Sequence, residues 1–138
     1  MRKFWTLALT PLLALAFFLV GAPSANAFGS EVLGCAWNGG GWVASNCGGG
    51  SGQVVFSAHN LSGSYSYSWT IVNDLGYSYG PCTGATPCII SGCTATSSTC
   101  TLAAEGPLHD RVVTASLTLH QSGLSRTIQA KATIWGTS

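Results

Sequence analysis

Residues 113–134 read VTASLTLHQSGLSRTIQAKATI, and this stretch decides the fold. Apolar and polar side chains alternate on both sides of a short, glycine-containing turn at 121–124. Alternate side chains of a β-strand point to opposite faces of a sheet, so each half predicts a strand with one buried face. Two such strands around a short turn predict a β-hairpin. The expected inward residues are Val113, Ala115, Leu117, Leu119, Ile128, Ala130, Ala132 and Ile134.

The same alternation recurs upstream of the hairpin. One strand is expected from Gln53, with Val54, Phe56 and Ala58 on its inner face and a turn at 59–63. The next run places an aromatic and apolar face opposite a hydroxyl-rich face, and its expected inward residues are Tyr65, Tyr67, Trp69 and Ile71. Shorter strands are expected at 88–91 and 99–103. Several strands with one hydrophobic face each predict an all-β fold, an antiparallel sandwich of two sheets.

The first 27 residues have the pattern of an export signal. Two basic residues precede an apolar run from Leu7 to Val20, and small residues follow as far as Ala27. A membrane helix is the alternative, but the run contains Pro11 and is shorter than the about 20 residues that a span needs. We therefore predict cleavage near Ala27, a secreted or periplasmic protein, and no membrane span in the mature chain, residues 28–138.

All cysteines lie in the predicted mature chain: Cys35, Cys47, Cys82, Cys88, Cys93 and Cys100. An even number in an oxidising compartment predicts up to three disulfides, and fifteen connectivities are open. Proximity favours Cys35 with Cys47 and leaves the other four to pair among themselves. Zinc is the alternative, but the chain has no C-x-x-C pair and its histidines are scattered, so we expect no metal and no cofactor.

The segment before the first predicted strand is rich in glycine and tryptophan. Residues 34–52 read GCAWNGGGWVASNCGGGSG. Each glycine loses much backbone entropy when it is ordered, so this stretch has little preference for helix or strand. We predict a compact, disulfide-closed segment at 28–52 that forms one domain with the sandwich at 53–138.

Two stretches resemble bacterial immunoglobulin-like domains of the polycystic-kidney-disease (PKD) type. They are YSYSW at 65–69 and the hairpin with VTASLTL at 113–119 and SGLS at 122–125, and the likeness spans Gln53 to Trp135. That family continues its tryptophan as W-D-F-G-D-G, whereas Trp69 is followed by TIVNDLG, which keeps Asp74 and Gly76 but loses the acidic loop. The cysteines between 82 and 100 also depart from the family. The resemblance implies an immunoglobulin-like, non-catalytic binding or spacer module.

Charged groups are scarce in the mature chain. Three basic residues stand against four acidic ones, a net charge of −1. Without a basic patch to neutralise phosphates, nucleic acid is excluded as an expected partner. Glu105 and Asp110 flank a turn with His109 and could serve acid–base chemistry, but exposed carboxylates are usually just solvated. We predict no enzyme and keep a small hydrolase as a distant alternative.

The sequence indicates neither a histidine metal site nor a serine nucleophile. His59, His109 and His120 are not at metal-ligand spacing within one element, and no G-x-S-x-G turn marks a serine nucleophile. Asn60-Leu61-Ser62 fits the glycosylation sequon of a eukaryotic secreted protein.

Aromatic residues outside the predicted strands are the best candidates for ligand binding. Trp37, Trp42, Tyr77 and Tyr79 fall in predicted loops, where exposed rings stack on sugars or fill a partner's pocket. The alternative is that they cover the core of a domain this small. Trp69 is assigned to the core. The predicted function is a secreted binding or adhesion module for an extracellular glycan or protein.

A second reading concerns the loop GPCTGATPC at 80–88, which is bounded by cysteines and braced by prolines. A rigid, stapled loop loses little entropy on binding, as in inhibitors of extracellular proteases or other secreted enzymes, although any small secreted domain has such loops. The last strand could pair with another chain, but Lys131 would blunt that edge. We expect a monomer.

Overall fold

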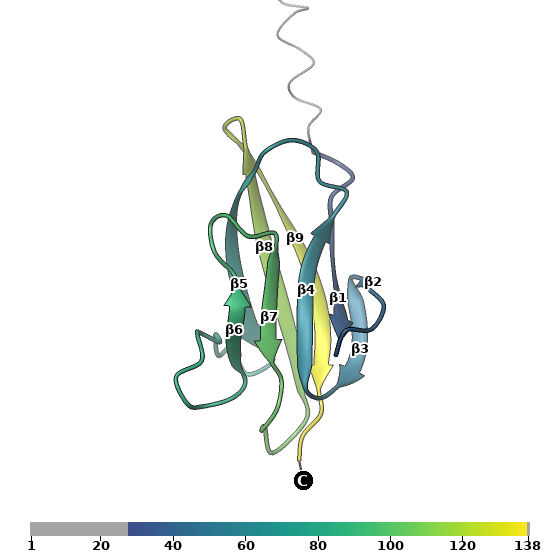
Figure 1. Cartoon of the computed structure of the whole chain (residues 1–138), viewed down its shortest axis with the longest axis vertical. Helices are drawn as coiled ribbons and strands as arrows, with labels where there is room; N and C mark the ends of the chain where they lie inside the picture. Colours follow the sequence, from purple (N-terminus) through teal and green to yellow (C-terminus); the bar gives the residue numbers. More distant parts are fainter. Residues whose placement is uncertain (1–27, 138) are drawn as a thin grey trace, which may run out of the picture.

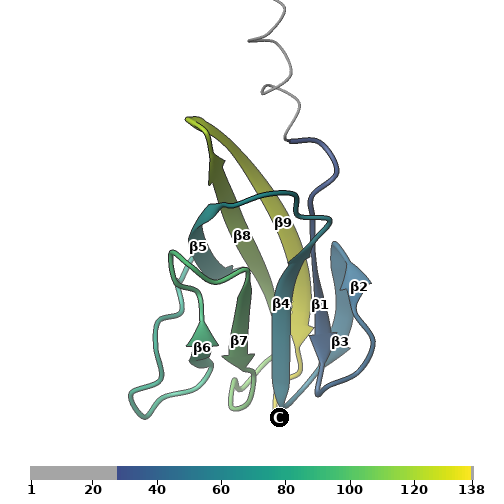
Figure 2. The ribbon, with the colours of Figure 1, turned by 45° about the horizontal axis from the view of Figure 1, so that its top comes forward.

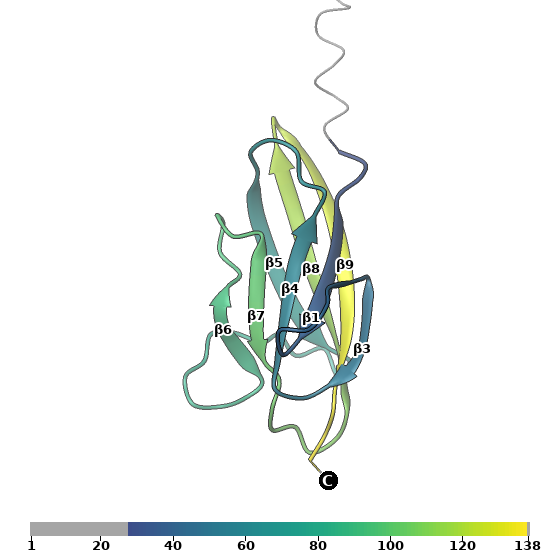
Figure 3. The same cartoon turned by 45° about the vertical axis from the view of Figure 1, so that its right-hand side comes forward.

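The computed structural model describes residues 28–137, which fold into two facing β-sheets (Figure 1). The predicted signal peptide lies outside the described residues. The five-stranded sheet has the order β2 (Val43–Ala44), β1 (Val32–Trp37), β4 (Gln53–His59), β7 (Thr99–Ala103) and β6 (Cys88–Gly92). The four-stranded sheet has the order β3 (Asn46–Gly50), β9 (Leu124–Ile134), β8 (Arg111–Gln121) and β5 (Ser66–Asn73). Figure 3 shows the two sheets as separate layers.

The predicted hairpin is confirmed as β8 and β9. Gln121 pairs with Leu124, so the turn is the dipeptide Ser122-Gly123, and both residues have positive φ (51° and 77°). A two-residue turn of this kind matches the right-handed twist of the strands that it joins. All the predicted inward residues of the hairpin are buried, and the hairpin extends beyond the other strands (Figure 2).

The other predicted strands are confirmed as β4, β5, β6 and β7. Val54, Phe56 and Leu102 are fully buried between the sheets. The inward face of β5 is less covered than expected, because β5 is an edge strand: Ile71 is buried, whereas Trp69 is only half-buried against the core.

Within residues 28–52, the expectation of a loop for the glycine-rich part from Gly34 to Gly52 is wrong. This segment contains β1, β2 and β3, and β1 carries the fully buried Leu33 and Cys35 into the core. The chain leaves the five-stranded sheet after β2 and enters the four-stranded sheet as β3. There β3 runs parallel to β9, so one pair departs from the antiparallel pattern.

Tryptophans explain why this segment is rich in glycine. A Cβ on Gly50 would lie 2.6 Å from Cδ2 of Trp37, inside the sandwich. A Cβ on Gly49, on the outer face, would collide with the indole of Trp135. The two glycines thus let two large rings lie directly against β3. At these two positions glycine lets an indole ring approach the backbone closely, and its flexibility is not the reason for its use.

Three disulfides link Cys35 with Cys47, Cys82 with Cys88, and Cys93 with Cys100. The preferred Cys35–Cys47 pairing is confirmed, and it joins β1 of one sheet to β3 of the other. The remaining two close short loops beside β6. Loops of this length give about 2–3 kcal/mol each in the chain-entropy account. Such a set of disulfides indicates an oxidising, extracellular or periplasmic location.

The opposite side of the sandwich is crossed by residues 77–82, which we call the strap. At one end the Tyr79 amide donates to the Ile71 carbonyl of β5 at 2.8 Å. At the other end the Cys82 amide donates to the Ile89 carbonyl of β6 at 3.0 Å, and the Ile89 amide donates to the Gly80 carbonyl at 2.8 Å. The strap therefore occupies backbone groups on both edge strands.

Hydroxyl side chains cover most of the outer face of the four-stranded sheet. Thr118 and Thr127 share a hydrogen bond across β8 and β9 with 2.8 Å between their Oγ1 atoms. Gln129 donates to Ser116 Oγ at 2.9 Å, and Ser68 Oγ lies 3.2 Å from Nε2 of His120. The face is thus polar mainly through neutral groups, with the exposed Lys131 of β9 as a charged exception.

Glu31 is the buried charge at the upper end of the sandwich. Arg126 donates to its Oε1 at 2.7 Å, the Gly29 amide donates to the same oxygen at 2.8 Å, and Tyr65 donates to Oε2 at 3.2 Å. Burial raises the pKa of Glu31, but these hydrogen bonds outweigh burial and hold the pKa below its ordinary value of 4.5. The carboxylate therefore ties the start of the domain to β9.

Gly50→Ala should destabilise the domain by about 1–3 kcal/mol, because the new methyl group meets the half-buried Trp37 ring that packs on the core. Gly49→Ala is the matched control on the same strand. It displaces only the exposed Trp135 and should cost less than about 1 kcal/mol. Chemical denaturation of both variants measures the free energy of unfolding. An equal decrease in the two variants would contradict the packing of Trp37 against Gly50.

Glu31→Gln should flatten the acid dependence of stability. Since the pKa of Glu31 is lower in the folded than in the unfolded chain, its stabilisation is complete above the unfolded value and is lost as the pH falls through the folded value. The wild type should therefore lose more Tm between pH 7 and pH 3 than the variant. Identical Tm changes would show that Glu31 contributes nothing to acid sensitivity.

Candidate functional site

The lower end of the sandwich, where the C-terminus lies in Figure 1, carries an exposed tryptophan. Trp135 follows the last residue of β9, and the alternation of that strand turns its side chain outward. Its side chain is 54% exposed, and its indole lies over Gly49. Part of the ring therefore rests on β3 while the rest stays open to solvent.

Backbone hydrogen bonds anchor the chain around this tryptophan, whose indole rests on Gly49. The Trp135 amide donates to the Gly50 carbonyl at 2.8 Å, and the Gly136 amide donates to Oδ1 of Asp110 at 2.7 Å. The Thr137 amide donates to the Pro107 carbonyl at 3.0 Å. A ring fixed before a ligand arrives loses little entropy on binding.

Beside the ring is a hollow of about 430 Å³. Glu105 contributes a carboxylate and Ser51 and Thr137 contribute hydroxyls, while Gly106 and Gly136 complete the lining. No basic side chain lines it. The arrangement offers an aromatic surface together with hydrogen-bonding oxygens, and its only charge is negative.

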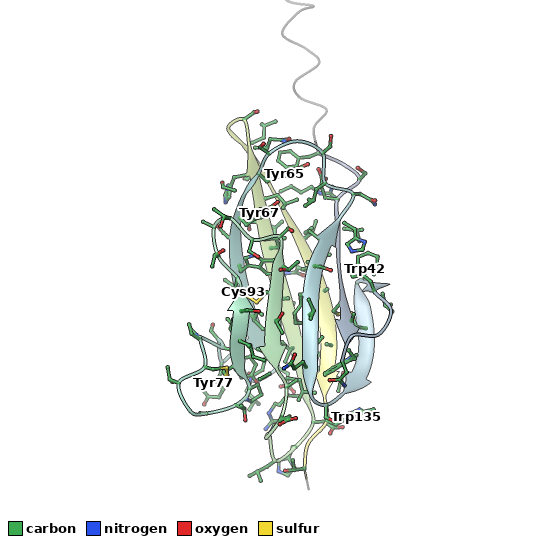
Figure 4. All side chains as sticks on the ribbon, viewed as in Figure 1. Trp42, Tyr65, Tyr67, Tyr77, Cys93 and Trp135 are labelled. Atoms are coloured by element: carbon green, nitrogen blue, oxygen red, sulfur yellow. A yellow bond between two sulfur atoms is a disulfide. The ribbon has the colours of Figure 1, made fainter. Side chains whose placement is uncertain are left out.

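The four predicted ligand-binding aromatics are not brought together. Tyr77 is 68% exposed in the strap, on the side opposite Trp135 and Trp42 (Figure 4). Tyr79 is half-buried, and its hydroxyl accepts a hydrogen bond from Asn73 Nδ2 at 3.1 Å. Of the four, only Tyr77 has the exposed side chain that the prediction requires.

The two predicted tryptophans serve packing. Trp37 ends β1 and does not lie in a loop, and it packs against the core. Trp42 is half-buried, stacks on His59 with 3.8 Å between ring centroids, and donates its indole N–H to the Ser57 carbonyl at 3.1 Å. Neither tryptophan lines the hollow beside Trp135. Trp135 itself is not among the ligand-binding residues predicted from the sequence. The signal was present, because extending the alternation of β9 by one residue turns Trp135 outward.

The two acid–base candidates, Glu105 and Asp110, have different roles in the structure. Asp110 binds the Gly136 amide, whereas Glu105 lines the hollow, which contains no histidine. Among residues 28–137, no three His, Cys, Asp or Glu residues lie close enough to hold a metal ion. Within the same range, no helix has the length and hydrophobicity needed to cross a membrane.

The stapled loop is exposed, as the inhibitor reading requires. Residues 83–86 between Cys82 and Cys88 are all exposed. The β5–β6 connection that contains them runs out from the body of the sandwich in Figures 1 and 3. The loop is therefore available to a partner.

Comparison with known proteins finds no matching family model, no matching curated protein and no matching solved structure. The function is therefore inferred from the residues of the chain. Exposure, fixed geometry and chemistry coincide best at Trp135.

Proposed function

We propose that this protein is a secreted, non-catalytic, immunoglobulin-like module that binds a neutral extracellular glycan at the Trp135 hollow. The observation that carries the proposal is an exposed indole held in a fixed position beside the carboxylate of Glu105. Sugar rings present C–H groups on their faces and hydroxyls at their edges. The indole suits the first, and Glu105, Ser51 and Thr137 suit the second.

Charge narrows the class of glycan. Glu105 would repel a polysaccharide that carries carboxylates or sulfates, and no basic side chain in the hollow compensates for it. Neutral polysaccharides meet no such penalty. A glycan is favoured over a protein partner because the lining of the hollow combines one aromatic ring with polar groups.

Strand order supports the immunoglobulin-like identity. Immunoglobulin domains place strands A, B, E and D in one sheet and C, F and G in the other. The order β1-β4-β7-β6 and the order β5-β8-β9 correspond to these sets. Trp69 then occupies strand C, although the disulfide between the sheets joins β1 to β3 and not strands B and F as in antibody domains. We include in this proposal that the domain is of the PKD type.

Export and a monomeric state complete the proposal. The three disulfides agree with cleavage of a signal near Ala27 and release from the cytoplasm. The strap shields the edges of β5 and β6, β2 has only two residues, and β3 is irregular. Edges of this kind resist pairing with a second copy.

Trp135→Ala should weaken binding to the preferred polysaccharide at least tenfold, about 1.4 kcal/mol, because the stacking surface is removed. Binding of the purified, oxidised protein to insoluble cellulose, chitin, β-glucan and cell walls is measured by depletion. Trp42→Ala is the matched control, since its ring packs on His59 away from the hollow. Loss of binding in the control alone would move the site to Trp42, and no retention of the wild type would refute glycan binding.

A second candidate function, inhibition of an extracellular protease, is favoured by the exposed Cys82–Cys88 loop. An inhibitor of this kind should reduce the activity of a secreted protease in proportion to its concentration. Replacing residues 83–86 by glycine should abolish the effect while Trp135→Ala preserves it. Residual protease activity measures both, and undiminished activity across serine, cysteine and metalloproteases would eliminate this candidate.

A further inference from the structure

A second cavity, of about 340 Å³, lies on the side of the sandwich between the edge strands β5 and β6. Its walls come from Trp69 and Ile71 of β5, Tyr79 and Pro81 of the strap, and Ile89 and Cys93 at β6. In Figure 4 this side, marked by Cys93 and Tyr77, lies across the molecule from Trp135. The cavity shares no lining residue with the Trp135 hollow.

The walls of this cavity are fixed from both sheets. The strap crosses it, bonded to Ile71 at one end and to Ile89 at the other. The Cys82–Cys88 disulfide restrains the strap where it reaches β6. A cavity formed before a ligand arrives avoids the ordering cost of binding.

The polar ends of the two aromatic walls already have partners. The Trp69 indole N–H donates to the Ser97 carbonyl at 2.8 Å, and the Tyr79 hydroxyl accepts a bond from Asn73 at 3.1 Å. Their ring surfaces remain as the cavity's contact area. The other polar residues in the lining are Thr70, Ser78 and Thr94, whose side chains are uncharged.

The composition and volume define the occupant. No Asp, Glu, Lys, Arg or His lines the cavity, so a charged ligand would lose its hydration without gaining a partner. The volume is at the lower end of the range for small-molecule sites. We propose that this cavity binds a small, uncharged, largely apolar ring compound, with its ring against Trp69 and Tyr79. This site goes beyond the proposed glycan function.

Gly80 is a position in the cavity lining where a side chain can be added without straining the fold. It lines the cavity, its φ is not positive, and a Cβ there would meet no atom within 4 Å. Gly41 has the same two properties and lies outside the cavity. Gly80→Leu and Gly41→Leu thus form a matched pair of blocking and control variants.

The test is a fluorescence titration of the oxidised protein with N-phenyl-1-naphthylamine, a neutral probe that brightens in apolar surroundings. We expect saturable binding at one site, at least tenfold weaker in Gly80→Leu and unchanged in Gly41→Leu and Trp135→Ala. NMR should show the indole N–H signal of Trp69 moving as the probe binds the wild type. Absence of saturable binding, equal binding by Gly80→Leu, or a static Trp69 signal would each overturn the proposal, whatever the outcome of the glycan test.

Discussion

A stack of two sheets leaves two open sides, and the rest of this structure depends on how the chain closes them. Unpaired edge groups and an uncovered core are both costly. On one side β1 and β3 carry the chain from sheet to sheet, with Cys35 and Cys47 joined across the gap. On the other side the strap does the same between β5 and β6. Closure on both sides lets a chain this short bury a complete core and places each cavity at a margin of the sandwich.

Periodicity made the central strands predictable from sequence. Leu117 and Ile128 are adjacent on the inner face because register and alternation leave no other place for them. The N-terminal strands were not predictable in this way. Their alternation is hidden, since Gly49 and Gly50 contribute no side chains and the rings that cover them come from Trp135 and Trp37, distant in sequence. A glycine run is read as a loop until its partners are known.

The candidate site shows the same limit. The exposure of Tyr77 is predictable from sequence, because it lies in a segment without periodicity, and the structure leaves it exposed. Trp37 and Trp42 stand in a similar stretch, but tertiary contacts half-bury both rings. Trp135 was passed over as the end of a strand. Its role depends on the tail bonds to Pro107 and Asp110, which bring together segments that sequence alone cannot pair.

The hydroxyl-covered outer sheet has a consequence for how the stability of the domain depends on salt. Dissolved ions screen interactions between exposed charges, whereas hydrogen bonds among neutral hydroxyls give them little to screen. Within residues 28–137 only two ion pairs are formed, and one of them joins Arg126 to the buried Glu31. Buried pairs are screened much less than exposed ones. The stability of the folded domain should therefore change little over a wide range of salt concentration.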